Sequence, residues 1–312
     1  MIIVTGASGF IGGVISLKLK DAGYSVVGID RRPCPGKLTS CFEQFIESDY
    51  IDALEFIADA NADVIIHCAG QSLVGPSMTD PQDYYHNNIV KTLKLADMIV
   101  KHSPNTRLMF SSSAAVYGIP IMTTCNEVDP CEPISPYGES KLAIEWILKA
   151  YNRAYKLDYV AFRYFNVVGA ESQRMHGQAP GATHIISRAL ESIKNKTEFT
   201  LYGNNYETPD GTCIRDYIHV EDVAAAHIAG FDRKILSGVY NLGTNKGVSN
   251  MEILSKAVEV TGIKFPIVFK DKRPGDPAIL VGEADKFQKA AGWQSKHTLT
   301  DIISHAWAWY NR

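Results

Sequence analysis

Residues 5–12 read Thr-Gly-Ala-Ser-Gly-Phe-Ile-Gly and lie between a short apolar run and a segment with helical periodicity. Glycine permits tight turns and lets the backbone approach a bound group closely. A helix that starts at such a turn offers free N–H groups and the positive end of its dipole, and both favour a phosphate. A glycine-rich turn without a ligand is the alternative. The strand–turn–helix context favours a dinucleotide pyrophosphate site. Its expected contacts are Gly6, Gly9, Phe10, Ile11 and Gly12.

Short apolar runs alternate with longer helical segments through the first half of the chain. Buried parallel strands are expected at residues 2–4, 25–29, 64–67, 107–110 and 159–162. Helical patterns lie between several of them, at 12–22, 88–100 and 136–155. This alternation predicts an α/β fold, a doubly wound parallel sheet of the Rossmann type with a smaller mixed α/β substrate lobe.

The pattern changes after about residue 166. Loops are expected at 169–182, 203–213 and 273–278, strands at 214–220 and 239–242, and helices within 250–312. Residues near 216–243 are expected to return to the first sheet. We therefore expect a cofactor-binding domain of residues 1–165 with 216–243, and a substrate-binding lobe of residues 166–215 with 244–312.

Composition excludes several classes of function. The chain has 312 residues, and its net charge of −3 provides no basic field for nucleic acid or an anionic membrane. No apolar run approaches the roughly 20 residues that span a bilayer, and no signal peptide is expected. Six scattered cysteines without a CxxC pair predict neither a metal site nor a disulfide framework, and they favour a cytoplasmic location.

Asp30 closes the second expected strand, near the offset at which a carboxylate binds ribose. It would accept hydrogen bonds from the adenosine ribose and repel a 2′-phosphate, which favours NAD over NADP. Arg31 and Arg32 follow at once and could instead bind such a phosphate. A simple pairing of Asp30 with one of these arginines is a third interpretation.

Tyr137 and Lys141 are spaced i, i+4 at the start of an expected helix, with Ser135 as a plausible N-cap and Pro136 in the first turn. A phenol with a pKa of about 10 is a poor base at neutral pH. A nearby ammonium and a positively charged nicotinamide both favour the phenolate. Lowering the pKa by roughly 3 units takes about 4 kcal/mol of differential stabilisation. A surface Tyr/Lys pair is the alternative.

Three serines, residues 111–113, end the expected strand that precedes this helix. Alone they could cap or turn the chain. Together with the YxxxK pattern and the GxxGxxG spacing at residues 6–12, they resemble the extended short-chain dehydrogenase/reductase family. The resemblance implies Ser113, Tyr137 and Lys141 as the catalytic set. Sugar-nucleotide dehydratases carry Thr-Asp-Glu where this chain has Ser112-Ser113-Ala114, which disfavours that branch.

The same resemblance implies NAD as the cofactor. His67-Cys68-Ala69-Gly70 matches the family's next cofactor turn, although strand-end chemistry alone could explain it. Ser72 stands where some members have a lysine near the cofactor phosphates, which leaves the tightness of NAD retention open. Besides the glycine turn and Asp30, the implied cofactor contacts are Asp49, Tyr50, Cys68, Ala69, Gly70, Asn88, Ser111, Tyr137, Lys141 and Tyr164.

Residues 163–170, 183–186, 201–220 and 273–278 resemble the UDP-glucose 4-epimerase branch of the family. Arginine forks at 215 and 273 suit a diphosphate, although each could form a structural ion pair instead. Asp276 could accept ribose hydroxyls and Tyr202 could contact uracil. The implied substrate contacts are Ser113, Tyr137, Asn166, Thr183, His184, Ile185, Thr200, Tyr202, Arg215, Arg273, Asp276 and Leu280.

This branch implies an isomerase that reversibly inverts C4 of a UDP-hexose. Tyr137 would take and return the proton of the 4-hydroxyl, and NAD would take and return the C4 hydride. Ser113 would orient the proton, and Lys141 would hold the nicotinamide ribose. Leu280, or Ile279 after a one-residue slip, aligns with the gate for the sugar 2-substituent, so N-acetyl sugars are expected to enter to some degree.

Two other functions stay open from the sequence: a net oxidoreductase that releases its reduced cofactor, and a Rossmann redox sensor without turnover. Helices near 88–101 and 136–155 carry broad apolar faces, with Ile89, Leu93, Ala96 and Val100 on one and Ile144, Ile147, Leu148 and Tyr151 on the other. Family members pair these helices, so a homodimer is expected, although burial of the same faces against the sheet would explain them equally.

Overall fold

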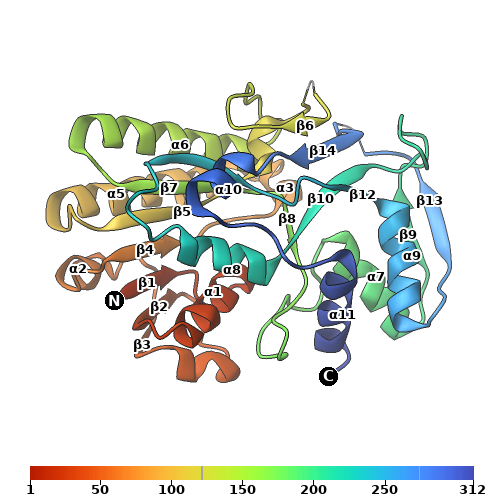
Figure 1. The fold of residues 1–312 in the computed structure, drawn as a ribbon, viewed down its shortest axis with the longest axis horizontal. Coiled ribbons are helices and arrows are strands. Elements are labelled where there is room, and N and C mark those ends of the chain that lie inside the picture. The colour runs from red at the N-terminus through yellow and green to blue at the C-terminus, as the bar shows by residue number, and fades with distance from the viewer. Residues whose placement is uncertain (121, 274) are drawn as a thin grey trace.

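A seven-stranded parallel sheet forms the centre of the larger half of the structure, a computed structural model that describes residues 1–120, 122–273 and 275–312 (Figure 1). Its strand order is β11-β7-β5-β4-β1-β2-β3, so the chain moves outward from β1 in both directions. The predicted Rossmann sheet is thereby confirmed. Ligands of such sheets bind at the carboxyl ends of the strands, where the order reverses. The strands are β1 (Ile2–Thr5), β2 (Val26–Asp30), β3 (Gln44–Glu47), β4 (Val64–His67), β5 (Arg107–Ser113), β7 (Tyr159–Tyr164) and β11 (Gly238–Leu242).

Helices cover both faces of this sheet. Along β1, Ile2 and Val4 join the core beneath α1 and α8, whereas Ile3 joins the core beneath α5 and α6. Both faces are therefore apolar, which is why the strands read as continuous hydrophobic runs. The helices are α1 (Phe10–Asp21), α2 (Leu54–Asp59), α3 (Val74–Ser77), α4 (Pro81–Tyr84), α5 (Lys91–His102), α6 (Pro136–Tyr155) and α8 (Val220–Ala229), with 3₁₀ turns at Gly36–Cys41 and Ala114–Tyr117.

Helix α6 has the predicted bounds, because its signals are local. The Ser135 hydroxyl accepts a hydrogen bond from the Gly138 N–H at 3.2 Å, and Pro136 occupies the first turn. The helix expected at 88–100 is different: a π-helical turn at Tyr85–Val90 precedes α5. π-Helical turns are rare and concentrate at functional sites.

A second sheet is centred on β10 (Ile214–His219), which pairs with strands from distant parts of the chain. Residues 216–219 therefore lie in the second sheet, whereas α8 and β11 return to the first as expected of 216–243. The remaining elements are β6 (Thr124–Cys125), β8 (Asn166–Val168), β9 (Phe199–Tyr202), β12 (Gly247–Ser249), β13 (Ile267–Lys270), β14 (Ile279–Gly282), α7 (Ile185–Asn195), α9 (Asn250–Thr261), α10 (Asp285–Ala291) and α11 (Leu299–Tyr310).

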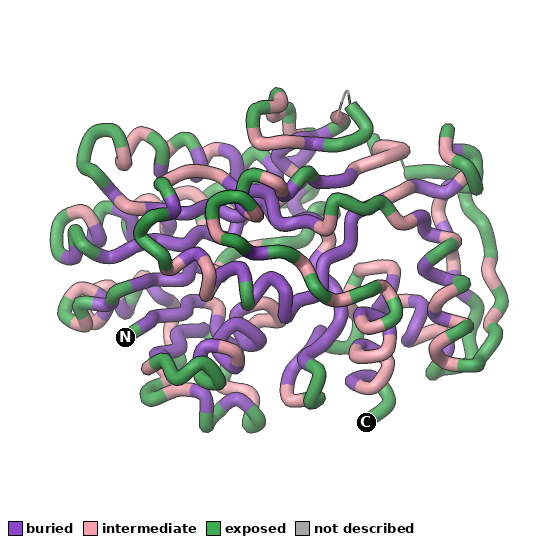
Figure 2. Tube along the Cα trace, in the orientation of Figure 1, coloured by how far each residue is buried: buried purple, intermediate pink, exposed green. Residues whose placement is uncertain are grey.

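Buried residues follow the central strands and the helix faces that touch them, while exposed residues gather on the outer loops (Figure 2). A separate core lies among α7, α9 and α11. Within the residues that the structure describes, no helix has both the length and the apolarity needed to cross a membrane.

Candidate active site

The Ser–Tyr–Lys set lies where β5 ends and α6 begins. Ser113 is the last residue of β5, and Tyr137 and Lys141 lie in the first turns of α6. The buried Lys141 donates from Nζ to the backbone carbonyl of Ser111 at 2.9 Å, and its Nζ is 5.9 Å from the centroid of the Tyr137 ring. The structure thus brings the three predicted catalytic residues to the carboxyl end of one central strand.

Burial acts on both ionisable members of the set. It raises the pKa of Tyr137, and hydrogen bonding by Ser113 acts in the opposite direction. Burial also lowers the pKa of Lys141 to about 8. The depression of the tyrosine pKa expected from Lys141 is therefore not observed in the chain alone, because desolvation is the dominant effect and Ser113 is the group that opposes it. Further positive charge beside the phenol is needed to favour the phenolate.

The other two serines of the triplet have structural partners. Ser112 donates to Glu145 Oε1 at 2.5 Å, and Glu145 forms a buried ion pair with Arg163 at 2.7 Å. Ser111 Oγ lies 3.0 Å from the Tyr164 hydroxyl and 3.3 Å from Cys68 Sγ. These contacts leave Ser113 as the serine of the triplet beside Tyr137.

The glycine turn has the shape that a pyrophosphate requires. Gly6 has a φ of +73°, and a Cβ there would lie 2.7 Å from the Ala69 nitrogen. A Cβ on Gly12 would lie 2.3 Å from the Gly6 carbonyl oxygen. Helix α1 starts after Gly9 without a side-chain cap, so its first N–H groups are available to an anion. Phe10 and Ile11 form this first turn.

Asp30 lies at the end of β2, beside the glycine turn. Its Oδ2 accepts a hydrogen bond from the Ser8 N–H at 3.0 Å, and its Oδ1 accepts from the Arg32 N–H at 2.9 Å. The Arg32 side chain also pairs with it, Nε to Oδ1 at 3.4 Å. The interpretation as an arginine-paired carboxylate is therefore observed, at the same strand end that ribose binding requires.

Asn88 holds the turn at residues 68–71, where the sequence predicts further cofactor contacts, by hydrogen bonds. Its Oδ1 accepts from the Gln71 N–H at 2.8 Å, and its Nδ2 donates to the Gln71 carbonyl at 3.1 Å and to Ser140 Oγ at 2.9 Å. A Cβ on Gly70 would lie 2.8 Å from Asn88 Oδ1. Asn88, on the π-helical turn, thus ties the turn at Cys68, Ala69 and Gly70 to α6.

Asp49 and Tyr50 follow β3, the strand that the sequence did not reveal. Asp49 pairs with Lys91 at 2.5 Å, and the Tyr50 ring packs edge-on against His67 with centroids 4.8 Å apart. The Tyr50 hydroxyl is buried and has no partner among the described residues. Lys91 escaped sequence analysis, because only tertiary packing brings the first residue of α5 to Asp49 in the segment after β3.

The predicted diphosphate ligands already have partners. Arg215 Nη2 lies 2.5 Å from Asp276 Oδ1 and 2.6 Å from the Pro277 carbonyl oxygen, so the alternative of an ion pair is observed. The guanidinium of Arg273 lies 4.5 Å from the centroid of the Tyr202 ring. Tyr206 also donates to Asp276 at 3.2 Å, a neighbour that sequence analysis missed. The structure therefore groups these arginines with Tyr202 and Asp276 across β9, β10 and the loop before β14.

Apart from Leu280, the remaining predicted substrate residues lie on or just before β8, α7 and β9. Asn166 begins β8 and donates from Nδ2 to the Asp216 carbonyl at 3.0 Å. Thr183 and His184 precede α7, which starts at Ile185 without a side-chain cap, and burial lowers the pKa of His184. The Thr200 carbonyl accepts from Arg188 at 3.2 Å.

Leu280 lies beside Arg215 in the parallel register of β14 and β10. It is half-buried and packs on a core that includes Tyr117, Leu142 and Phe165. The side chain thus borders the group of predicted diphosphate ligands on one side and an apolar core on the other.

A histidine cluster appears where the sequence predicted no metal site. Ligand atoms of His219, Glu221, His297 and His305 lie within 4.8 Å of one another. His219 Nδ1 accepts from the Glu221 N–H at 3.0 Å, so its Nε2 carries the hydrogen and donates to His305 Nδ1 at 3.0 Å. His297 bonds Asp222 at 2.9 Å and Glu221 at 3.2 Å. Hydrogen bonding within the cluster thus satisfies these atoms without an ion.

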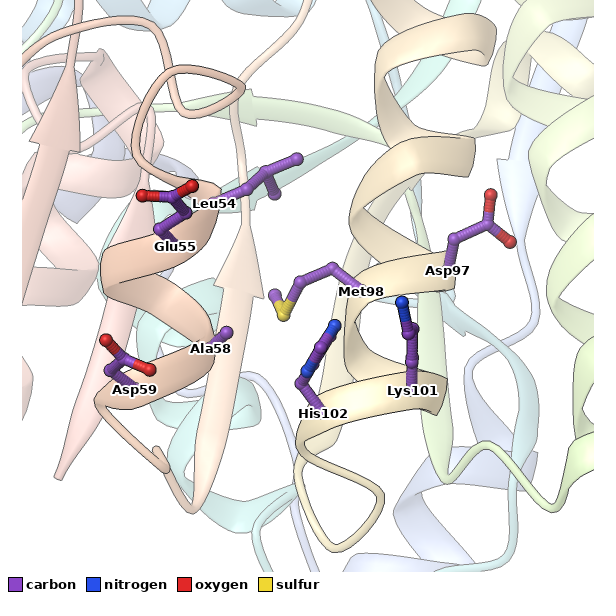
Figure 3. Close-up of a pocket in the computed structure, with 8 residues that line it drawn as sticks. All are labelled: Leu54, Glu55, Ala58, Asp59, Asp97, Met98, Lys101 and His102. Carbon is purple, nitrogen blue, oxygen red and sulfur yellow. The ribbon is translucent and has the colours of Figure 1, made fainter.

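A hollow of about 500 Å³ lies between α2 and α5 (Figure 3). Its lining includes Leu54 and Glu55 of α2 and Met98 and His102 of α5. None of the predicted site residues lines it. The candidate active site therefore rests on the convergence of side chains at the strand ends and not on this hollow.

Comparison with known proteins agrees with this geometry. Residues 2–243 match the NAD dependent epimerase/dehydratase family. The chain is 37% identical to UDP-glucose 4-epimerase of Halalkalibacterium halodurans, over 99% of this chain and 95% of the relative. The crystal structure of UDP-glucose 4-epimerase from Brucella ovis in complex with NAD superposes with a TM-score of 0.92 at 35% identity, covering 98% of this chain and 97% of that one. The UDP-Glc/GlcNAc 4-epimerase of Campylobacter jejuni gives a TM-score of 0.86 at 32% identity, covering 99% and 98%. The chain belongs to the NAD dependent epimerase/dehydratase family.

Proposed function

We propose that this chain is an NAD-dependent UDP-glucose 4-epimerase, an isomerase that interconverts UDP-glucose and UDP-galactose. The observation that carries the proposal is the meeting of Ser113, Tyr137 and Lys141 at the end of β5. Full-length similarity to UDP-glucose 4-epimerases supports the same reaction. An acid–base set at the carboxyl edge of a Rossmann sheet suits proton exchange with a sugar hydroxyl.

The residues of the first two turns fit NAD. The uncapped start of α1 and the Gly6 turn would hold its pyrophosphate, and Asp30 its adenosine ribose. Lys141 would hold the nicotinamide ribose. When bound, NAD supplies the acceptor and then the donor for the C4 hydride, and it ends each cycle unchanged.

Tyr137 takes the proton from the 4-hydroxyl and later returns it. Since burial raises its pKa, the phenolate depends on positive charge at the same place. The Lys141 ammonium provides one such charge and the oxidised nicotinamide ring another. Ser113, whose hydrogen bonding already favours the phenolate, orients the proton and the sugar oxygen.

The UDP portion of the substrate stays bound while the sugar turns over, so that the opposite face of C4 meets the cofactor. Arg215 and Arg273 bind the diphosphate, with Asn166 beside them, and Tyr202 and Asp276 bind the uridine. Both Nη groups of Arg215 already donate, to Asp276 and to the carbonyls of residues 214, 277 and 278, so Nε–H is the fifth donor of the fork that would reach the phosphate. Thr183, His184, Ile185 and Thr200 complete the nucleotide pocket.

Leu280 determines how large a substituent at the sugar 2-position the pocket accepts. A leucine at this wall leaves more volume than a tyrosine, so the N-acetyl forms of the substrate are accepted to some degree. The Campylobacter jejuni neighbour, named for both UDP-Glc and UDP-GlcNAc, supports acceptance of the larger substituent.

The division into an NAD-binding domain of residues 1–165 with 216–243 and a UDP-sugar lobe of residues 166–215 with 244–312 stays part of the proposal. A cytoplasmic location is part of it as well.

A homodimer through α5 and α6 completes the proposal. Ala96, Ile144 and Leu148, which the sequence placed on the pairing faces, pack in the core against the sheet. Trp146 of α6 is nevertheless 64% exposed, and this large apolar ring is one that a partner would cover. Light scattering at micromolar concentration tests this: a monomeric mass rejects the dimer, and Trp146→Glu should shift a dimer towards monomer.

One assay separates the proposed reaction from its rivals. Purified protein is incubated with UDP-glucose, UDP-galactose and their N-acetyl forms while sugar products and NADH absorbance are both followed. An epimerase converts the sugars with no net NADH. Stoichiometric NADH identifies a net oxidoreductase, and NAD binding without turnover of any sugar identifies a binding protein or redox sensor.

A further inference from the structure

The loop between β8 and α7 reaches the cofactor turn through one histidine. His176 Nε2 lies 3.0 Å from the carbonyl oxygen of Gly9, the residue that precedes α1. A carbonyl only accepts, so Nε2 carries the hydrogen and donates it. The His176 side chain is buried, and burial lowers its pKa, so the ring is neutral at neutral pH.

This contact is closely packed. A Cβ on Gly13 would lie 2.5 Å from His176 Nε2, so only a glycine at that position of α1 admits the ring. On its other side the ring meets Trp309 of α11 edge-on, with centroids 6.1 Å apart. The indole of Trp309 donates to the Gln178 carbonyl at 2.7 Å, which fixes α11 against the same loop.

The loop is also closed by its own hydrogen bonds and tied to α1 at a second point. The Glu171 carboxylate accepts from the backbone N–H groups of Gln173 and Met175, both at 3.0 Å. Lys18 of α1 pairs with the same carboxylate at 3.1 Å. His176 is therefore presented to Gly9 by a loop with an ordered backbone.

The Gly9 carbonyl controls the orientation of a possible phosphate donor. In a trans peptide the C=O of one residue and the N–H of the next point in opposite directions within one plane. The Gly9 carbonyl points along the helix, where it also accepts the Gly13 N–H at 2.8 Å. The Phe10 N–H must then point out of the start of α1, towards the position where an anion binds. Because α1 has no side-chain cap, no cap residue performs this orientation.

We propose that His176 is a positioning residue for the pyrophosphate of NAD: it holds the peptide unit between Gly9 and Phe10 so that the Phe10 N–H points at a phosphate oxygen. The inference rests on the proposed NAD-dependent function and adds to it a link from the loop and α11 to cofactor retention. Removing the imidazole donor leaves the Gly9 carbonyl with one hydrogen bond and lets this peptide unit rock.

The test measures NAD retention separately from activity. Holoenzyme is diluted into NAD-free buffer, and NAD release is followed together with UDP affinity and thermal stability. His176→Leu should release NAD about three- to tenfold faster, the scale of one neutral hydrogen bond, with unchanged UDP affinity. His176→Gln, whose amide nitrogen can replace Nε2 as the donor, should stay near wild type. Gln173→Ala, an exposed change in the same loop, is the matched control.

Each outcome decides between distinct explanations. Wild-type retention in His176→Leu overturns the inference. Equal losses of NAD retention, UDP affinity and stability that His176→Gln does not rescue show general damage and overturn it as well. If His176→Leu does not fold, His176→Asn replaces it, because the shorter amide does not reach Gly9. Equal NAD retention in the Asn and Gln variants then overturns the inference. A wild-type protein that neither contains nor binds NAD rejects the proposed function itself.

Discussion

The Lys141 ammonium lies 5.9 Å from the centroid of the Tyr137 ring, one helical turn further along α6. A hydrogen bond to the Ser111 carbonyl holds it there. The lysine charge is thus fixed near the phenol but does not contact its oxygen by any hydrogen bond that the structure records. Lys141 therefore acts on the phenol through its charge and not through a shared proton, and because its own pKa is about 8 this effect weakens as the pH rises above that value, while the tyrosine hydroxyl stays available to the substrate.

Tyr137→Phe should abolish epimerisation while leaving the fold and NAD content intact, because only a hydroxyl is lost and the ring remains. Turnover of UDP-galactose and the NAD content of the purified variant are the measurements. A rate near that of wild type in a folded variant would show that another group is the base.

Ser113→Ala should slow turnover by roughly 10²–10⁴-fold, the usual scale for a lost proton-handling group. Ser112→Ala is the control: it deprives the Glu145–Arg163 pair of a hydrogen bond and should reduce stability by about 1 kcal/mol with a much smaller effect on rate. A loss of less than threefold in Ser113→Ala would move the role to a neighbouring serine.

Asp30→Ala should weaken NAD binding and reduce discrimination against NADP, since the carboxylate both accepts ribose hydroxyls and repels a 2′-phosphate. Arg32→Ala removes the ion pair but keeps the carboxylate, so it should preserve the NAD preference. Calorimetric titration with both dinucleotides makes the comparison. If the wild type already prefers NADP, our interpretation of Asp30 is wrong.

Leu280→Tyr should selectively suppress the reaction of N-acetyl sugars, because the added ring clashes only with the larger 2-substituent. The measurement is kcat/KM for both substrate pairs in wild type and variant. Equal losses for the two pairs would indicate general damage, and no loss for either would place Leu280 outside the pocket.

Stability should fall at alkaline pH through His297. Hydrogen bonds to Asp222 and Glu221 raise its pKa from an ordinary 6.5 to about 9, while the stacked His219 and the neighbouring His305 complete its surroundings. The stabilisation is complete below pH 6.5 and is lost as the pH rises through about 9. Urea unfolding across this range should show a steeper decline for wild type than for His297→Gln, which carries no such charge. Parallel declines would reject the interpretation.

Local signals predicted local structure well. Helix α6 was predicted with its bounds because Ser135, Pro136 and the apolar periodicity all lie within it. The strand at 214–220 was also expected, but its place in the second sheet was not. Strand pairing is decided by partners far along the chain, and a continuous apolar run contains no information about which sheet it joins. The short strand β3 has an exposed–intermediate–intermediate–exposed pattern, typical of an edge, and so gave no signal.

In the candidate site, too, local features were predicted from the sequence and long-range contacts were not. Motif spacing was enough to bring Ser113, Tyr137 and Lys141 together, because a strand end and a helix start carry them. The pairing of Arg215 with Asp276 and the convergence of His219 with His297 and His305 depend on tertiary packing. The direction of the Tyr137 pKa shift also depends on burial, which composition and spacing do not determine.

Strand β6 has consequences for synthesis on the ribosome. Thr124 and Cys125 pair with Val281 and Gly282 of β14, so a strand made early finds its partner only when nearly the whole chain has emerged. In the Rossmann sheet this delay is shorter: β1 to β5 have all their neighbours made by residue 164, and β7 waits only for β11, which is made by residue 242. Nascent chains stalled before residue 282 should therefore present a formed first sheet with an unpaired β6 edge. Such an edge is open to association with other chains, and it is a natural docking point for a chaperone until β14 arrives.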